Sequence, residues 1–133
     1  MITLDTVEAT LALGNALYLW RDGEGGSLGY FKSIALWRSD DRGATWREVG
    51  VRFSKADGDF RGVDEGIFAP AFCQFGRDYA GARDDYLYIY APDSIDPSHW
   101  NVRLPGRINL LRVPRGQVEV KDAYEFHAGA PGE

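Results

Sequence analysis

The sequence predicts an all-β domain with about two antiparallel four-stranded sheets, and three observations support this fold class. Aromatic residues and glycines are abundant, with four Trp, seven Tyr, seven Phe and 16 Gly in 133 residues, a composition that favours strands and tight turns. Strand-like runs follow the same order in the two halves of the chain, and a short polar turn joins two of them. A chain of this length can bury one core, so we expect a single domain over residues 1–133.

Four strands are expected in the first half of the chain, in a unit that spans about residues 8–54. Runs rich in aliphatic, aromatic and branched residues predict these strands at residues 10–13, 15–20, 33–38 and 45–49. The connection between the second and third strands is rich in glycine, which favours a loop.

A second unit spans about residues 60–129 and repeats the order of the first. Its strands are expected at residues 66–76, 85–90, 107–113 and 123–126. In both units a Leu-Tyr-aliphatic strand precedes an Ile-x-Leu strand that ends in arginine, and an outer strand with aromatic and charged residues follows. A repeat of about 70 residues with three or four strands is typical of β-propeller blades that carry long loops.

In the expected strand at residues 85–90, tyrosines alternate with aliphatic residues, so the two faces of this strand differ. Tyr86, Tyr88 and Tyr90 fall on one face, and Leu87 and Ile89 fall on the other. We interpret the tyrosines as ordinary sheet packing, with a platform for stacking sugar rings as the alternative.

The polar turn from Ser39 to Trp46 reads Ser-x-Asp-x-Gly-x-Thr-Trp. Ser39 and Asp41 have short polar side chains that can bond nearby backbone N–H groups, and Gly43 can adopt a positive φ without steric cost. Thr45 returns the chain to extended geometry, and Trp46 anchors the turn by apolar burial. This pattern resembles the Asp-box of sialidase-type β-propellers, and the resemblance implies a structural role for these residues.

Residues 75–90 carry a second resemblance, and its most specific part is the run Tyr-Ala-Gly-Ala-Arg-Asp-Asp-Tyr at residues 79–86. Together with residues 111–114 and 123–129, they are similar to a family of five-bladed, glycosidase-like propellers, formerly a domain of unknown function, with arabinan-degrading glycoside hydrolases among its relatives. Such a propeller needs about 300 residues, so the chain would supply about two blades of an incomplete β-propeller. These glycosidases often place an acid after a proline on an inner strand, where this chain has Ala71.

Charge and motif content argue against several classes of function. The net charge of −5 comes without a basic block, so we expect no nucleic-acid binding, and no long apolar run predicts membrane insertion. The single Cys73 and the distant His99 and His127 give no ligand set, and no cofactor motif is present, so we expect no metal and no cofactor. No signal peptide is recognised, which makes a cytoplasmic location the default and secretion the alternative for a piece of a longer protein.

Glycoside hydrolysis normally uses two carboxylates beside the scissile bond, and the chain offers two candidate groups. Asp64 and Glu65 precede an apolar run, although we favour a solvated loop pair as their interpretation. Asp84 follows Arg83, and here we favour a brace that shapes the next turn. The candidate substrate-binding residues are Arg83, Tyr88 and Tyr90.

We therefore expect a carbohydrate-associated, sialidase- or glycosidase-like propeller fragment that is not catalytic by itself. One alternative is a homo-oligomeric interaction or structural module, in which partner chains complete the open sheet edges. Another is a glycoside hydrolase, if the chain assembles into a complete propeller. A carbohydrate ligand and further copies of the chain are the expected partners.

Overall fold

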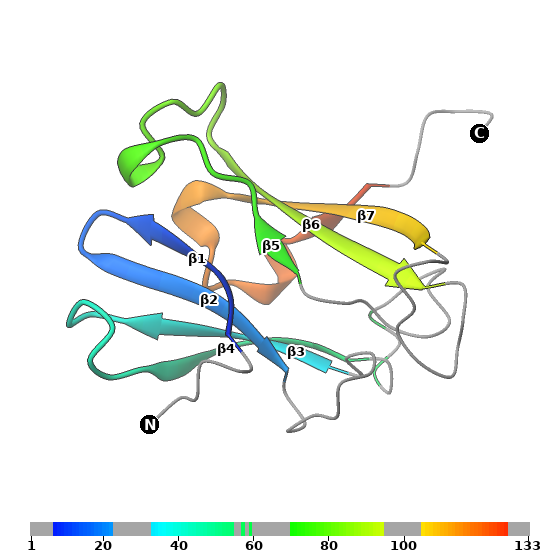
Figure 1. Ribbon diagram of the computed structural model, residues 1–133, viewed down its shortest axis with the longest axis horizontal. Helices are drawn as coiled ribbons and strands as arrows, with labels where there is room; N and C mark the ends of the chain where they lie inside the picture. Colours follow the sequence, from blue (N-terminus) through cyan, green and yellow to red (C-terminus); the bar gives the residue numbers. More distant parts are fainter. Residues whose placement is uncertain are drawn as a thin grey trace.

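The computed structural model describes residues 7–22, 33–54, 57, 59, 70–94 and 105–127. In these residues the chain forms two four-stranded antiparallel sheets, and each strand pairs with its neighbours in sequence order (Figure 1). No α-helix occurs in this part of the chain. The all-β prediction with two antiparallel sheets is confirmed.

The first sheet, called sheet 1, lies in the N-terminal half. Its strands are β1 (Val7–Leu13), β2 (Ala16–Asp22), β3 (Ser33–Ser39) and β4 (Arg47–Ser54). Sheet 2 follows with β5 (Ala71–Phe72), β6 (Tyr86–Ser94), β7 (Pro105–Pro114) and β8 (Glu125–Phe126). Among the described residues, three single 3₁₀ turns accompany sheet 2, namely η2 (Arg77–Tyr79), η3 (Arg115–Gln117) and η4 (Lys121–Ala123).

The outer strands of sheet 2 are shorter than the sequence predicts. In the described part of the expected strand at residues 66–76, only Ala71–Phe72 forms a strand. Beyond it the chain turns, because Gly76 has a φ of 82° and the N–H of Gly81 donates to the carbonyl of Phe75 at 2.7 Å. At the other edge, η4 occupies the start of the region predicted as a strand at residues 123–126. Local turn formation thus replaces strand pairing at both edges.

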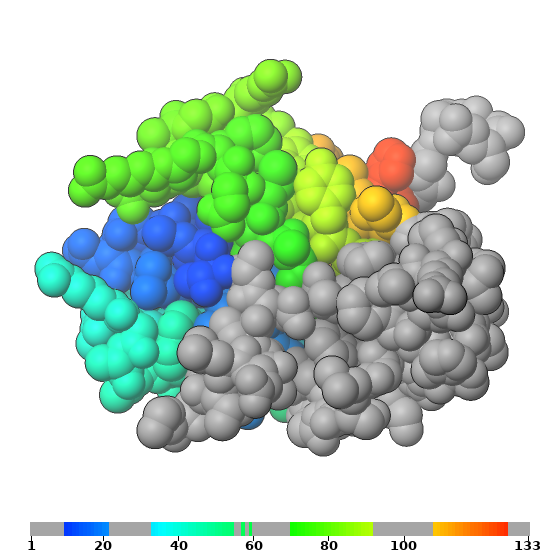
Figure 2. Space-filling model, viewed as in Figure 1, coloured from blue at the N-terminus to red at the C-terminus, as the bar shows by residue number. Residues whose placement is uncertain are grey.

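One aromatic cluster joins the two sheets, and Trp20 of β2 lies at its centre. The Trp20 ring stacks on Phe72 of β5 with centroids 5.9 Å apart and meets the edge of Tyr124 at 5.9 Å. Phe53 of β4 lies 6.1 Å from Trp20 and 5.3 Å from Tyr124. The sheets therefore share one hydrophobic core, and Figure 2 shows residues of β1 in direct contact with the segment that contains β5 and η2.

The turn between β3 and β4 is held by its own side chains. Ser39 Oγ accepts a hydrogen bond from the N–H of Gly43 at 2.8 Å, and the Asp41 carboxylate accepts from the N–H of Thr45 at 2.8 Å and from the Thr45 hydroxyl. Trp46 Nε1 donates to the carbonyl of Gly43, whose φ of 89° suits glycine. The hydrogen bonds from Thr45 lower the pKa of Asp41 to about 2.

The connection between β7 and β8, residues 115–124, docks on sheet 1. Glu119 accepts hydrogen bonds from Arg38 of β3 at 2.6 Å and from the hydroxyl of Tyr18 of β2 at 3.2 Å. Lys121 forms an ion pair with Asp59 at 3.1 Å. This connection therefore joins sheet 2 to sheet 1 through polar contacts around the edge of the aromatic core.

Candidate functional site

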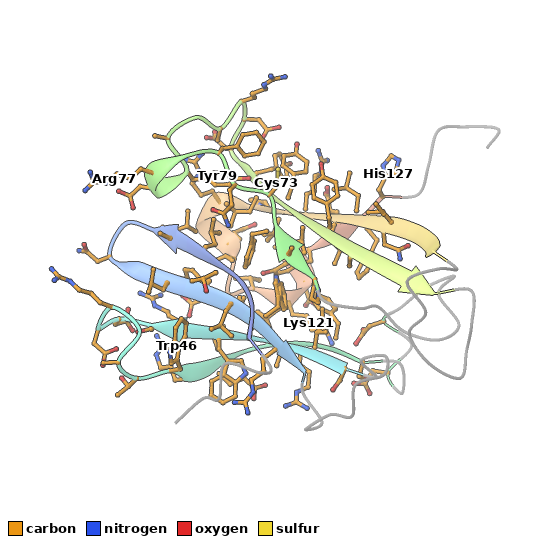
Figure 3. All side chains as sticks on the ribbon, viewed as in Figure 1. Trp46, Cys73, Arg77, Tyr79, Lys121 and His127 are labelled. Carbon is orange, nitrogen blue, oxygen red and sulfur yellow. The ribbon has the colours of Figure 1, made fainter. Side chains whose placement is uncertain are left out.

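Sheet 2 exposes the face that points away from sheet 1, and we call it the open face. Along β6 and β7 the residues Leu87, Ile89, Leu111 and Val113 are buried in the core, so the alternating residues point the opposite way. The open face consists of Tyr86, Tyr88, Tyr90, Ile108, Leu110, Arg112, Glu125 and His127. Figure 3 shows His127 on the side of β7 away from sheet 1 and Lys121 on the side toward it.

A row of three polar side chains crosses the open face. Tyr88, Arg112 and Glu125 are cross-strand neighbours on β6, β7 and β8. Arg112 Nε donates to Glu125 Oε2 at 2.6 Å, and the guanidinium lies 4.2 Å from the centroid of the Tyr86 ring. The ion pair and the aromatic contact hold the Arg112 guanidinium, and therefore its charge, at a fixed position beside Glu125 and Tyr86.

The turn before β6 supplies a further carboxylate next to this row. Asp84 accepts hydrogen bonds from the Tyr88 hydroxyl at 2.6 Å and from the N–H of Tyr86 at 3.0 Å. The hydrogen bond from Tyr88 is the main cause of the lowered pKa of Asp84, and the same contact raises the pKa of Tyr88. Asp84 is therefore ionised near neutral pH and orients the Tyr88 side chain.

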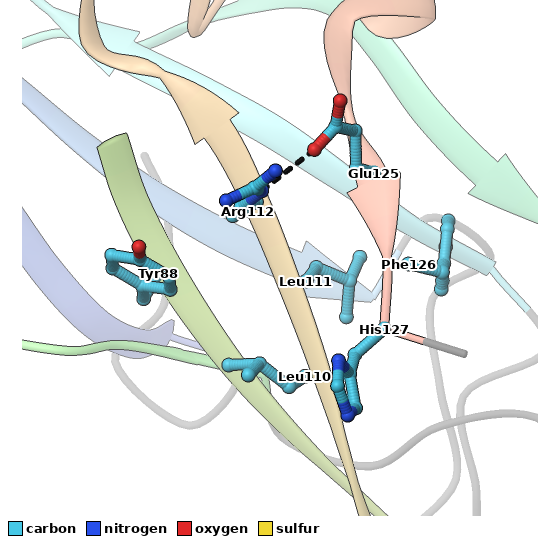
Figure 4. Close-up of a pocket in the computed structure, with 7 residues that line it drawn as sticks. All are labelled: Tyr88, Leu110, Leu111, Arg112, Glu125, Phe126 and His127. Carbon is cyan, nitrogen blue, oxygen red and sulfur yellow. Dashed lines mark hydrogen bonds and ion pairs between the residues drawn. The ribbon is translucent and has the colours of Figure 1, made fainter. Parts of the chain in front are cut away.

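A hollow of about 310 Å³ opens beside the row. It is lined by Tyr88, Leu110, Leu111, Arg112, Glu125, Phe126 and His127 (Figure 4). His127 is positioned by its backbone, whose N–H donates to the carbonyl of Leu110 at 2.8 Å. The hollow combines apolar walls with a guanidinium, a carboxylate, a phenol and an imidazole, which can contact a small polar ligand from several sides.

The structure brings some of the predicted site residues together. Asp84 and Tyr88 are hydrogen-bonded, and Tyr90 shares their sheet face, whereas Arg83 is exposed in the turn. Asp64 and Glu65 lie outside the described residues, so they stay predictions.

Sequence reasoning missed Arg112, Glu125 and His127 as members of one site. The repeated strand order places an arginine at the end of the third strand of each unit, and this pattern alone could have pointed to Arg112. The pairing of Glu125 with Arg112 depends on the register of β8, which only the structure gives.

Other classes of site find no support in the described part of the chain. No group of three or more His, Cys, Asp or Glu side chains there could hold a metal ion. No helix in the same residues is long and apolar enough to cross a membrane.

The comparisons with known proteins give no family for this chain. No protein-family profile matches it, and no curated protein shows significant similarity to it.

Proposed function

We propose that this protein binds carbohydrate on the open face of sheet 2 and does not catalyse hydrolysis by itself. The observation that carries the proposal is the row of Tyr88, Arg112 and Glu125 beside a hollow on an exposed sheet. Tyrosine rings offer flat apolar surface to the C–H faces of a sugar. The guanidinium donates to hydroxyl groups, and the carboxylates accept from them.

A propeller origin is part of the proposal. Each sheet runs through four strands in sequence order and the two sheets share one hydrophobic core, and both features favour a pair of neighbouring propeller blades. The turn from Ser39 to Trp46 has hydrogen bonds of the kind that the Asp-box resemblance implies. These features favour a pair of blades related to sialidase-like and arabinan-degrading glycosidase-like propellers.

The two acids at the open face do not favour catalysis. A glycosidase needs one carboxyl group that stays protonated near its working pH, and such a group has a raised pKa. The pKa of Asp84 is lowered instead, and Glu125 is paired with Arg112 at 2.6 Å. Asp64 and Glu65 remain the candidate catalytic residues for an assembled propeller.

The test is a titration of the ¹⁵N-labelled chain with arabino-oligosaccharides and, separately, with sialyllactose. We expect chemical-shift changes centred on Tyr88, Arg112 and His127 with at least one of these sugars. Arg112→Gln should weaken binding about tenfold or more, because it removes a charge-assisted hydrogen bond to the ligand. Tyr88→Ala should weaken it as well through the loss of ring stacking.

Arg52→Gln is the matched control. Arg52 is paired with Glu48 on β4, and its side chain is 43% exposed compared with 44% for Arg112. This variant should bind sugar as the unmodified chain does. Shifts that map elsewhere, equal losses in both arginine variants, or no response to either sugar would each contradict the proposal.

A further inference from the structure

The open face of sheet 2 corresponds, residue by residue, to the face of sheet 1 that packs in the core. In sheet 1 the pairs Tyr18–Arg38 and Trp20–Leu36 are cross-strand neighbours on β2 and β3. In sheet 2 the corresponding neighbours on β6 and β7 are Tyr88–Arg112 and Tyr90–Leu110. The next pair of cross-strand positions also corresponds, because Ile34 pairs with Asp22 in sheet 1 and Ile108 pairs with Pro92 in sheet 2.

The two equivalent faces differ in what covers them. In sheet 1, Trp20, Ile34 and Leu36 are fully buried, because sheet 2 packs on this face. In sheet 2 the equivalent Tyr90 is 45% exposed and Ile108 is 70% exposed. The same kind of face thus forms the centre of a packed interface in one sheet and is uncovered in the other.

The polar pairs Tyr18–Arg38 and Tyr88–Arg112 also differ in what covers them. Tyr18 and Arg38 both bind Glu119, which belongs to the connection between β7 and β8 of sheet 2. Tyr88 and Arg112 lie at the equivalent positions. Tyr88 binds Asp84 of the turn before β6, and Arg112 binds Glu125 of β8. The polar side chains of the open face therefore find their partners nearby, and no second sheet covers this face in the described part of the chain.

We propose that the open face is an interaction surface that associates with the open face of a second copy of this chain. A two-fold axis brings the same patch of both copies together, so the apolar strip of Tyr90, Ile108 and Leu110 packs on itself. The net charge of −5 opposes association in general. The pairing of Arg112 with Glu125 at 2.6 Å offsets these two charges, which reduces the repulsion between two copies at this face.

This proposal is independent of sugar binding and goes beyond it. The apolar strip and the hollow lie on one face, with the hollow at the end that carries Arg112 and His127. Leu110 belongs to both, so a second copy on the strip and a sugar in the hollow would compete for this face.

The experiment is analytical ultracentrifugation of the full chain over a wide range of concentrations. We expect a monomer–dimer equilibrium that Ile108→Glu weakens at least tenfold, because the introduced charge would be buried against an apolar strip. Tyr90→Glu is a second variant with the same expectation. Both side chains are exposed in the free chain, so the thermal transition of the monomer should not change.

Val120→Glu is the matched control, because it places the same charge at an apolar residue that is 48% exposed on the connection between β7 and β8, away from the open face. This variant should dimerise as the unmodified chain does. Three results would overturn the proposal: a chain that stays monomeric at all concentrations, a dimer that both open-face variants leave intact, or an equal loss in Val120→Glu. The first result would leave another kind of partner as the occupant of this face.

Discussion

Each sheet has one connection from its third strand to its fourth. In sheet 1 it is the turn from Ser39 to Trp46, and in sheet 2 it is the segment at residues 115–124. The first is closed by hydrogen bonds among its own residues. The second depends on the other sheet, where Glu119 meets Arg38 and Tyr124 meets Trp20. One connection is stabilised locally and the other by long-range contacts.

The difference predicts how each connection responds to damage. A change in the local turn should loosen that turn and leave the packing of the sheets intact. A change in the docked connection should weaken the contact between the sheets, so its cost appears in the unfolding of the whole domain.

The largest effect is expected for Tyr124→Ala. This ring packs against Trp20 and Phe53, and its hydroxyl donates to the carbonyl of Val118 at 2.7 Å. Removing the ring should cost about 3–5 kcal/mol in urea unfolding, whereas Tyr124→Phe should cost about 1 kcal/mol because only the hydrogen bond is lost. A loss below about 1 kcal/mol for Tyr124→Ala would show that the connection does not hold the sheets together.

Glu119→Gln should have the next largest effect. The substitution removes the charge that meets Arg38 in a half-buried position, and we expect a loss of about 1–2 kcal/mol. Glu48→Gln is the matched control, because the side chains of Glu48 and Glu119 are 33% and 34% exposed and both are paired with arginine. Hydrogen exchange should speed up at residues 115–124 in Glu119→Gln and stay unchanged at residues 39–46; the opposite pattern would reverse the comparison.

Gly43→Ala tests the local turn. At a φ of 89° an alanine is strained by about 1 kcal/mol, although its Cβ would meet only ordinary contacts with Trp46 and Leu17. Gly116→Ala is the control in the docked connection, where φ is not positive and no atom lies within 4 Å of the added Cβ, so it should be nearly neutral. Equal costs for the two variants in thermal unfolding would contradict the assignment of strain to Gly43.

The smallest effect concerns pH and Asp41. Its pKa falls from the ordinary 3.8 to about 2 in the folded chain, so the ionised carboxylate stabilises the fold above the higher value. This contribution should disappear as the pH falls from 3.8 towards 2. An NMR titration of the Asp41 carboxyl carbon gives the pKa directly, and Asp41→Asn should flatten the dependence of stability on pH in that range. A titration midpoint near 3.8 would contradict the hydrogen bonds assigned to Asp41.

Local patterns in the sequence predict much of the fold and little of the site. The strand order and the turn from Ser39 to Trp46 depend on neighbours within a few residues, so periodicity and turn chemistry indicate them. The contact between Glu119 and Arg38 spans 81 positions, and nothing near Glu119 in the sequence signals it. Alternation places Tyr88 and Tyr90 on one face, but only the packing of the sheets decides that this face is the exposed one.

The pairing of each strand with its sequence neighbours also sets an order of assembly during synthesis. Short loops close at low entropic cost, so sheet 1 can form as soon as residues up to 54 have left the ribosome. At that stage Trp20 and Phe53 still lack their contact with Tyr124, which emerges about 70 residues later. During that interval the aromatic face of sheet 1 is uncovered. The nascent chain is then most prone to aggregation and most accessible to chaperones.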